Sequence, residues 1–177
     1  MTGLAILILS FMSGVGQFLI YDFKKSDDLL NWEIINDGVM GGLSKGTVSV
    51  NEDGHGVFSG NISLENNGGF SMARYSFQSL ETKEYNKVVI RLRGDGKRYQ
   101  FRIKANRRDR HSYVQHFQTS GEWQQIEIGL NDMYPTFRGQ LLNMPNYPKV
   151  SMDEIAFLIA NKKAESFRLE IDYIKLR

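Results

Sequence analysis

The chain has 177 residues, of which 41% are hydrophobic and 24% charged, so it can bury one substantial core and has the composition of a soluble globular protein. Its net charge of +2 does not by itself indicate a class of partner. The absence of cysteine excludes disulfides, thiolate metal sites and a cysteine nucleophile.

The N-terminal residues differ in composition from the rest. The first 21 residues carry no charged side chain, and Leu4 to Met12 is almost entirely apolar, followed by the small residues Ser13 to Gly16. Such a run is typical of a signal peptide or of a membrane anchor. We therefore expect residues 1–16 to direct export to the periplasm or the membrane, and residues 17–177 to form a single domain. The alternative is a buried first strand in a cytoplasmic protein, which fits Phe18 to Phe23 better than the residues before them.

After this leader, apolar side chains recur at every second position. This spacing places one face of a β-strand on a core. It predicts strands, in chain order, at residues 58–64, 88–92, 99–105, 113–117, 126–130 and 167–171. In the run 99–105 the apolar side chains are Tyr99, Phe101 and Ile103, so Arg102 and Lys104 are expected on the opposite face.

Turn residues separate the predicted strands. Gly, Asn, Asp or Ser cluster at 51–54, 66–69, 94–96 and 120–122, and no long amphipathic helix pattern interrupts them. Short strands with frequent turns predict an all-β sandwich or barrel. Residues 131–150 contain all three prolines and no clear strand pattern, so we expect an ordered loop across one end of the fold.

The segment Gly42-Leu43-Ser44-Lys45-Gly46 matches the Gly-x-Ser-x-Gly pattern of a hydrolase nucleophile. In such enzymes the serine lies on a strained turn between a strand and a helix. Here the serine is followed by Thr47 to Val50, which is a strand pattern rather than a helical one. We therefore do not expect Ser44 to be a catalytic nucleophile.

The three histidines do not predict a metal site. His111 and His116 are an odd number of positions apart, so on one regular strand they point to opposite faces, and His55 lies in a Gly-rich turn. No carboxylate cluster stands out for acid and base chemistry. We expect no metal, no cofactor and no catalytic residue.

Three clusters of glycine with Asn or Asp remain, at 36–42, 66–70 and 93–96. Glycine allows positive φ and close backbone approach, and Asn or Asp side chains bind nearby backbone groups. Turn architecture is one interpretation of these clusters, and a binding site is the other.

These clusters resemble the family of complex I intermediate-associated protein 30. The matching elements, in order, are Trp32, the run from Asn36 to Ser44, Phe58 to Gly60, Ser63 to Phe70, Arg74, Arg93 to Gly96, Tyr99, Trp123, Pro135, Phe137 to Gly139 and a final strand around Phe167 to Ile174. The likeness extends from Phe18 to the C-terminus. Single pieces are unspecific, but their order and spacing carry the resemblance.

The resemblance implies a galactose-binding-like jelly-roll sandwich and a non-catalytic, chaperone-like assembly factor that binds intermediates of respiratory complex I. The expected partner is therefore a protein. The candidate binding residues are the polar members of the motifs, which either shape or line the site, together with three cations of a basic segment: Asn36, Asp37, Asn66, Asn67, Arg74, Arg93, Asp95, Arg102, Lys104 and Arg108.

A carbohydrate-binding module is the second hypothesis, because jelly rolls of this kind hold sugars through exposed aromatic rings and through Asn, Asp and Arg side chains. This hypothesis rests on fold analogy alone. It predicts that a concave face or loop end exposes two or more aromatic side chains from one set: Trp32, Tyr75, Tyr85, Trp123, Tyr134 and Tyr147.

Positive charge is concentrated between Arg91 and Arg110. This window holds nine Lys or Arg residues and only Asp95 and Asp109, a net charge of +7, so the rest of the chain carries −5. Such a patch attracts acidic surfaces, which favours an acidic protein partner. A merely solvated strand face is the alternative. No nucleic-acid-binding motif accompanies the patch, so we do not expect nucleic acid as the partner, and we expect membrane contact only through residues 1–16.

Overall fold

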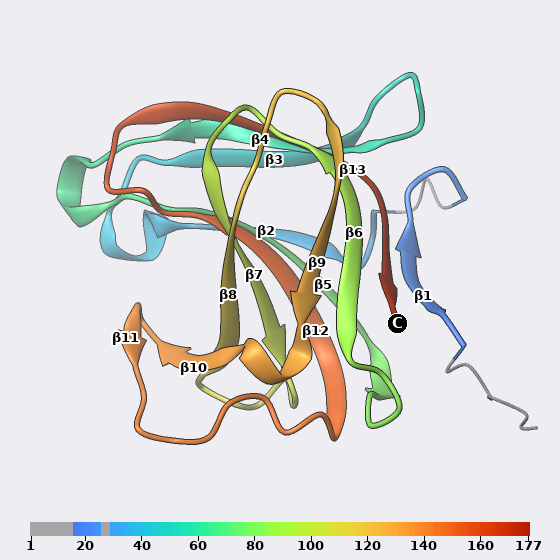
Figure 1. Cartoon of the computed structure of the whole chain (residues 1–177). Coiled ribbons are helices and arrows are strands. Elements are labelled where there is room, and N and C mark those ends of the chain that lie inside the picture. The colour runs from blue at the N-terminus through green and yellow to red at the C-terminus, as the bar shows by residue number, and fades with distance from the viewer. Residues whose placement is uncertain (1–15, 26–28) are drawn as a thin grey trace, which may run out of the picture.

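The computed structural model describes residues 16–25 and 29–177, which form two antiparallel β-sheets (Figure 1). The predicted leader, apart from Gly16, lies outside the described residues. Sheet A contains β3 (Lys45–Val50), β4 (Gly56–Ile62), β13 (Glu165–Leu176), β6 (Lys87–Arg93) and β9 (Trp123–Gly129), and β1 (Phe18–Asp22) also pairs with β13.

Sheet B contains seven strands: β11 (Gln140–Leu141), β10 (Tyr134–Phe137), β8 (Ser112–Gln118), β7 (Arg98–Lys104), β12 (Ser151–Ile159), β5 (Ser71–Glu81) and β2 (Trp32–Asn36). Three short 3₁₀ helices connect strands: η1 (Asp37–Met40), η2 (Glu65–Asn67) and η3 (Leu130–Asp132). None of the helices in the described ranges is long and apolar enough to cross a membrane. The prediction of an all-β sandwich is confirmed.

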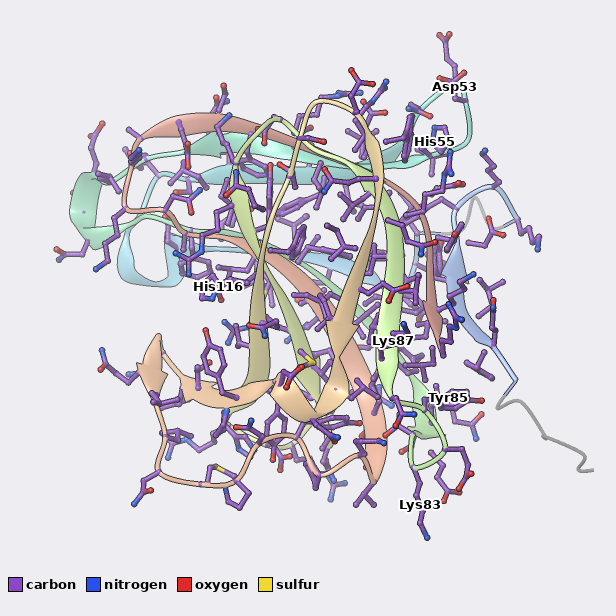
Figure 2. All side chains as sticks on the ribbon, viewed as in Figure 1. Asp53, His55, Lys83, Tyr85, Lys87 and His116 are labelled. Carbon is purple, nitrogen blue, oxygen red and sulfur yellow. The ribbon has the colours of Figure 1, made fainter. Side chains whose placement is uncertain are left out.

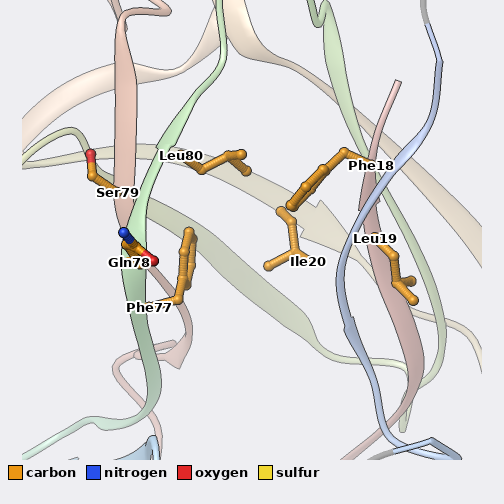
Figure 3. A pocket seen from close by; sticks show the side chains of 7 residues that line it. All are labelled: Phe18, Leu19, Ile20, Phe77, Gln78, Ser79 and Leu80. Carbon is orange, nitrogen blue, oxygen red and sulfur yellow. The ribbon is translucent and has the colours of Figure 1, made fainter.

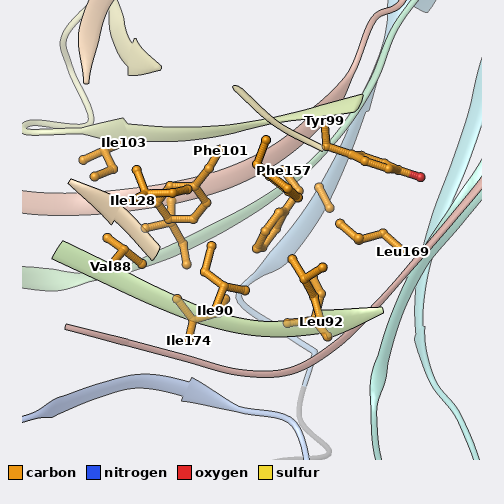
Figure 4. Close-up of a cluster of buried hydrophobic side chains, with 14 of the residues drawn as sticks. Val88, Ile90, Leu92, Tyr99, Phe101, Ile103, Ile128, Phe157, Leu169 and Ile174 are labelled. Atoms are coloured by element: carbon orange, nitrogen blue, oxygen red, sulfur yellow. The ribbon is translucent and has the colours of Figure 1, made fainter. Parts of the chain in front are cut away.

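The core lies between the two sheets (Figure 4). Sheet B contributes Tyr99, Phe101 and Ile103 from β7, each at most 1% exposed, as the alternation along β7 predicted. Sheet A contributes Ile90 and Leu92 from β6, which are fully buried. The polar residues between them, including the cations of β7, therefore point away from the core.

Two expectations about the elements were wrong or incomplete. Residues 131–150 are not a continuous loop, because Tyr134 to Thr136 pairs with β8 and residues 140–141 pair back on β10. Pro135 has no N–H to donate, which hid this strand in the sequence pattern. The strand β12 was also not predicted. It is buried on both faces over most of its length, so its apolar residues run continuously instead of alternating.

Candidate functional site

Asp37, a residue of the first glycine and asparagine cluster, is the centre of a buried hydrogen-bond network. It is only 4% exposed. Its carboxylate accepts hydrogen bonds from the backbone N–H (3.1 Å) and the hydroxyl (2.5 Å) of Ser44, and from the N–H groups of Gly69 (2.6 Å) and Phe70 (3.3 Å). Burial raises the pKa of Asp37, but these four hydrogen bonds outweigh burial and hold the pKa below its usual value.

The neighbouring asparagines also bind the protein's own backbone. The Asn36 side-chain oxygen accepts hydrogen bonds from the Gly46 N–H (3.2 Å) and the Ser71 hydroxyl (2.8 Å). The Asn66 amide donates to the Gly41 carbonyl (2.9 Å). Asn66 and Asn67 both have positive φ, which asparagine tolerates better than most residues. These contacts join η1, η2 and the start of β3, so the side chains of Asn36, Asp37 and Asn66 shape the loops.

The geometry around Ser44 is unlike that of a nucleophile. Its hydroxyl donates to Asp37 and accepts a hydrogen bond from the Ser63 N–H (3.1 Å), and the residue is 4% exposed. The chain then enters β3 rather than a helix. A nucleophilic serine needs an accessible hydroxyl that is hydrogen-bonded to a base. The expectation that Ser44 is not a hydrolase nucleophile agrees with this environment.

Ser44→Ala is therefore expected to remove no esterase activity and to lower the free energy of unfolding by about 1–3 kcal/mol, because the buried Asp37 carboxylate and Ser63 N–H lose a partner. Hydrolysis of p-nitrophenyl acetate and urea denaturation, compared with the unchanged chain, measure the two effects. Hydrolysis by the unchanged chain that disappears in the variant would restore the nucleophile hypothesis.

Two more of the predicted binding residues, Arg93 and Asp95, lie at sheet A and its adjoining turn. The Arg93 guanidinium donates to Glu170 (2.8 Å) and lies 5.3 Å from the ring centre of Trp123. Asp95 accepts hydrogen bonds from the Tyr99 hydroxyl (3.0 Å), the Lys97 ammonium (2.9 Å) and the Arg168 N–H (3.0 Å). Both side chains are therefore engaged in contacts that tie the β6–β7 turn to β13.

The structure divides the nine cations of the basic segment into two groups. Three form ion pairs: Arg91 with Asp172 (3.0 Å), Arg93 with Glu170 (2.8 Å) and Lys97 with Asp95 (2.9 Å). The other six have no carboxylate within ion-pair distance in residues 16–25 and 29–177: Arg98, Arg102, Lys104, Arg107, Arg108 and Arg110. The unneutralised charge therefore lies on β7 and on the loop after it.

The outer face of sheet B carries the β7 cations. One row of residues crosses six strands of this sheet in register: Glu33, Arg74, Ala156, Arg102, Val114 and Tyr134. Neighbouring strands are about 4.8 Å apart, so these side chains adjoin one another on a single face. Glu154 and Leu158 of the central strand β12 are on the same face and are only 6% and 9% exposed.

The two halves of this outer face differ in charge. On β5 and β12, Arg74 is balanced by Glu33 (2.5 Å) and Glu154 (3.6 Å). The half made by β7, β8 and β10 presents cations and neutral side chains and no carboxylate. We define this half as the basic face, made of Arg98, Gln100, Arg102, Lys104, Val114, His116 and Tyr134. Of the residues predicted from the sequence it contains Arg102 and Lys104, and the exposed Arg108 lies in the loop beside it.

Burial shifts the pKa values of three side chains on the outer face of sheet B: Arg102, Glu154 and His116. Burial lowers the pKa of the Arg102 guanidinium below its usual value, although nearby Glu154 acts in the opposite direction. Burial also raises the pKa of Glu154, and Arg74 and Lys104 only partly offset this effect. The pKa of His116 is lowered by burial and then by Arg98 and Arg102, which favours the neutral imidazole.

The histidines do not gather at one place. His55, beside the β3–β4 turn, and His116, on the outer face of sheet B, lie on opposite sides of the molecule (Figure 2). His111 packs edge-on against Tyr113 (ring centres 5.1 Å apart). In the part of the chain that the structure describes, no group of three His, Asp or Glu side chains is placed to hold a metal ion.

The aromatic side chains do not form an exposed platform on sheet B. Trp32 and Tyr147 are buried, and Tyr75 stacks on Trp32 (ring centres 5.1 Å apart). Tyr85 packs against Phe18, and Trp123 lies on sheet A beneath the guanidinium groups of two arginines. The carbohydrate hypothesis requires two or more of six aromatic residues to be exposed together, and of these six Tyr134 alone lies on the outer face of sheet B.

Two shallow depressions lie on the described surface, one of them at the Arg98 end of the basic face. One, of about 280 Å³, separates β1 from the second half of β5 and is lined by Phe18, Leu19, Ile20, Phe77, Gln78, Ser79 and Leu80 (Figure 3). The other, of about 330 Å³, is polar and lined by Gly96, Lys97, Arg98, Gln118, Asn161, Lys163 and Glu165. Only the polar depression adjoins the basic face, because both contain Arg98.

Comparison with solved structures shows the fold. A family 11 carbohydrate-binding module of a cellulosomal cellulase from Clostridium thermocellum is 20% identical, with a TM-score of 0.67 over 93% of this chain and 95% of that one. A family 11 carbohydrate-binding module from Clostridium thermocellum in complex with a beta-1,3-1,4-mixed-linked tetrasaccharide gives a TM-score of 0.66 over 93% of this chain and 96% of that one, also at 20% identity. A family 29 carbohydrate-binding module is 11% identical, with a TM-score of 0.55 over 91% and 87%. The protein is thus a jelly-roll sandwich of the galactose-binding-like type.

Sequence comparison shows the family. A mouse (Mus musculus) protein, complex I intermediate-associated protein 30, mitochondrial, is 23% identical over 184 aligned positions, which include 88% of this chain and 55% of the relative. The chain thus spans about half the length of that curated relative. The model of the family described as Complex I intermediate-associated protein 30 matches residues 21–171. The chain belongs to the family of complex I intermediate-associated protein 30.

Proposed function

We propose that this chain is a non-catalytic binding domain that recognises acidic protein partners and acts as a chaperone-like assembly factor. Membership of its family supports respiratory complex I intermediates as the partners. The observation that carries the proposal is the basic face together with the adjoining loop, where six cations lack carboxylate partners within the described residues. An acidic surface that binds there supplies the missing charges and is steered toward the face from a distance.

Hydrogen bonds to neutral groups of the protein hold two cations of the basic face in place. Lys104 donates to the Asp109 carbonyl (2.6 Å), and Arg102 donates to the Gln100 side chain (2.9 Å). Neither contact neutralises a charge, so each cation stays available to a carboxylate. Arg108 and Arg110 extend the charge along the following loop, where Arg110 lies 4.9 Å from the ring centre of Phe137. Positive charge thus continues from the strand into one end of the sandwich.

The test is capture of partners from a lysate of the native organism, comparing the unchanged chain with the variant R102Q/K104Q/R108E. Glutamine is used at the first two positions because a new carboxylate would lie beside Glu154. We expect the variant to melt as the unchanged chain does and to lose the captured proteins, with affinity for a recovered partner weakened about tenfold or more. The affinity of the unchanged chain should fall as salt rises, because added ions screen the exposed charges.

K45E/K83E is the matched control, since it changes the net charge by the same amount at exposed lysines outside the basic face. This control should retain binding. If R102Q/K104Q/R108E still captures its partner with unchanged affinity and salt dependence, the basic face is not the binding surface.

A carbohydrate ligand is the second hypothesis, and the fold of the solved relatives is its only support. The outer face of sheet B does not favour it, because the hypothesis requires two or more exposed aromatic candidates on one face and Tyr134 alone of the six lies there. Retardation of the chain in native gels containing mixed-linked beta-glucan, reduced by Tyr134→Ala, is the result that would favour a carbohydrate over a protein.

A further inference from the structure

Within the basic face, four side chains from β7, β8 and β10 adjoin one another: Arg98, Arg102, His116 and Tyr134. His116 lies directly opposite Gln100 and diagonal to Arg98 and Arg102, all on the outer face. The Tyr134 hydroxyl hydrogen-bonds to His116 Nδ1 (2.8 Å), and the two rings are stacked with centres 6.4 Å apart. This contact orients the imidazole and leaves its Nε2 without a hydrogen-bond partner in residues 16–25 and 29–177.

The two arginines beside this imidazole have unused donor groups. A guanidinium has five N–H donors, and Arg102 uses one of them for Gln100. Arg98 is exposed, and no ion pair holds it within the described residues. Arg98 also lines the polar depression of about 330 Å³ at the end of β7. A partner segment bound to Arg98 therefore has space to continue into this depression.

We propose that Arg98, Arg102, His116 and Tyr134 form a subsite for one carboxylate side chain of an extended acidic segment in the protein partner. The inference rests on the proposed function, which it makes more specific. Guanidinium groups bind carboxylates through paired, charge-assisted hydrogen bonds, and an imidazole N–H adds a further donor. Arg98, Arg102 and Lys104 share one face at intervals of even residue number, so an extended partner presents carboxylates to them at matching spacing.

Binding at this subsite has a pH signature. His116 faces Arg98 and Arg102 of β7 and Tyr134 of β10, and the arginines together with burial lower its pKa in the free protein. Beyond Arg102 lie Glu154 of β12 and Arg74 of β5, which pair with each other. A bound carboxylate compensates the two arginines and favours the protonated imidazole, so binding takes up a proton. The affinity for an acidic segment is therefore expected to rise as pH falls.

The experiment measures the proton NMR titration of the His116 ring in the full chain with and without a hexapeptide of alternating Glu and Ser, acetylated and amidated at its ends. A peptide of alternating Gln and Ser is the neutral control. We expect the Glu peptide, and not the Gln peptide, to raise the midpoint of the His116 titration. Calorimetry should show affinity for the Glu peptide rising several-fold between about pH 8 and about pH 5.5, the range in which histidine titrates.

Variants assign the effect to the subsite. R102Q and R98Q should each weaken Glu-peptide binding about fivefold or more, and H116Q should remove the pH dependence while binding at about pH 8 persists. K83Q is the matched control, because this exposed lysine lies in the turn between β5 and β6, outside the basic face and its adjoining loop. Melting curves show whether each variant is folded. If R102Q does not fold, the effect of R98Q on Glu-peptide binding tests the subsite.

A His116 midpoint that the Glu peptide leaves unchanged overturns the inference. Equal weakening of Glu-peptide binding by R102Q, R98Q and K83Q overturns it as well. Inorganic phosphate that raises the midpoint as strongly as the peptide would also overturn it, since the position would then be a general anion site. A captured protein partner whose affinity ignores R98Q, R102Q and H116Q contradicts the subsite while leaving the proposed function intact. Failure to capture any acidic partner contradicts the proposed function instead.

Discussion

Asp37→Ala is expected to lower the free energy of unfolding by about 3 kcal/mol or more, because two buried or half-buried loops lose the acceptor of four hydrogen bonds. The lost hydrogen bonds destabilise more than η1, because Ser44 directly precedes β3 and Gly69 lies just before β5. Urea denaturation, followed by the fluorescence of the buried Trp32, measures the change.

The effect should depend on pH in a direction set by the lowered pKa of Asp37. A carboxylate whose pKa is lower in the folded than in the unfolded chain stabilises the fold above its unfolded value, and this stabilisation is lost as pH falls through the folded value. Asp37→Asn should therefore cost most at neutral pH, and the difference from the unchanged chain should shrink below about pH 4. Ser63→Ala is a nearby control whose cost should not vary with pH, because no charge is involved. A cost of Asp37→Asn that stays constant down to about pH 3 would show that the charge of this carboxylate does not stabilise the fold.

Gly42→Ala is expected to destabilise the chain about as strongly, by about 3 kcal/mol, for a steric reason. A Cβ atom on Gly42 would lie 2.3 Å from Oδ1 and 2.4 Å from Cγ of Asp37. The carboxylate is buried and held by four hydrogen bonds, so it cannot move away without breaking them. Thermal or urea denaturation of the variant gives the cost.

The adjacent Gly41→Ala is the matched comparison. Gly41 has φ of +84°, but a Cβ atom there would meet only Asn66 Cβ at 3.9 Å, so the cost is the conformational one of about 1 kcal/mol. A double-mutant cycle tests the mechanism for Gly42. Once residue 37 is glycine, the contacting Oδ1, Cγ and Cβ atoms are all gone, so D37G/G42A should be scarcely less stable than D37G alone. Additive costs would mean that Gly42 is required for another reason.

Much of the sandwich could be predicted because several strands bury one face only. The alternation of Tyr99, Phe101 and Ile103 with polar residues predicted both β7 and the outward direction of Arg102. The same logic failed for β12, which lies in the middle of sheet B. There Glu154 to Ile159 are all buried, on both faces, and a strand covered on both sides loses the period of two.

For the candidate site, the sequence by itself determined which residue types are concentrated where, and tertiary structure decided which of them remain available. The excess of cations between Arg91 and Arg110 is a property of composition. Arg91 and Arg93 are neutralised by Asp172 and Glu170, carboxylates 81 and 77 positions away, which no local pattern reveals. His116 and Tyr134 became neighbours only through the pairing of β8 with β10. The physical reason is that alternation along one strand specifies the face on which a side chain lies, whereas the neighbours on that face come from other strands and depend on the order in which the strands pair.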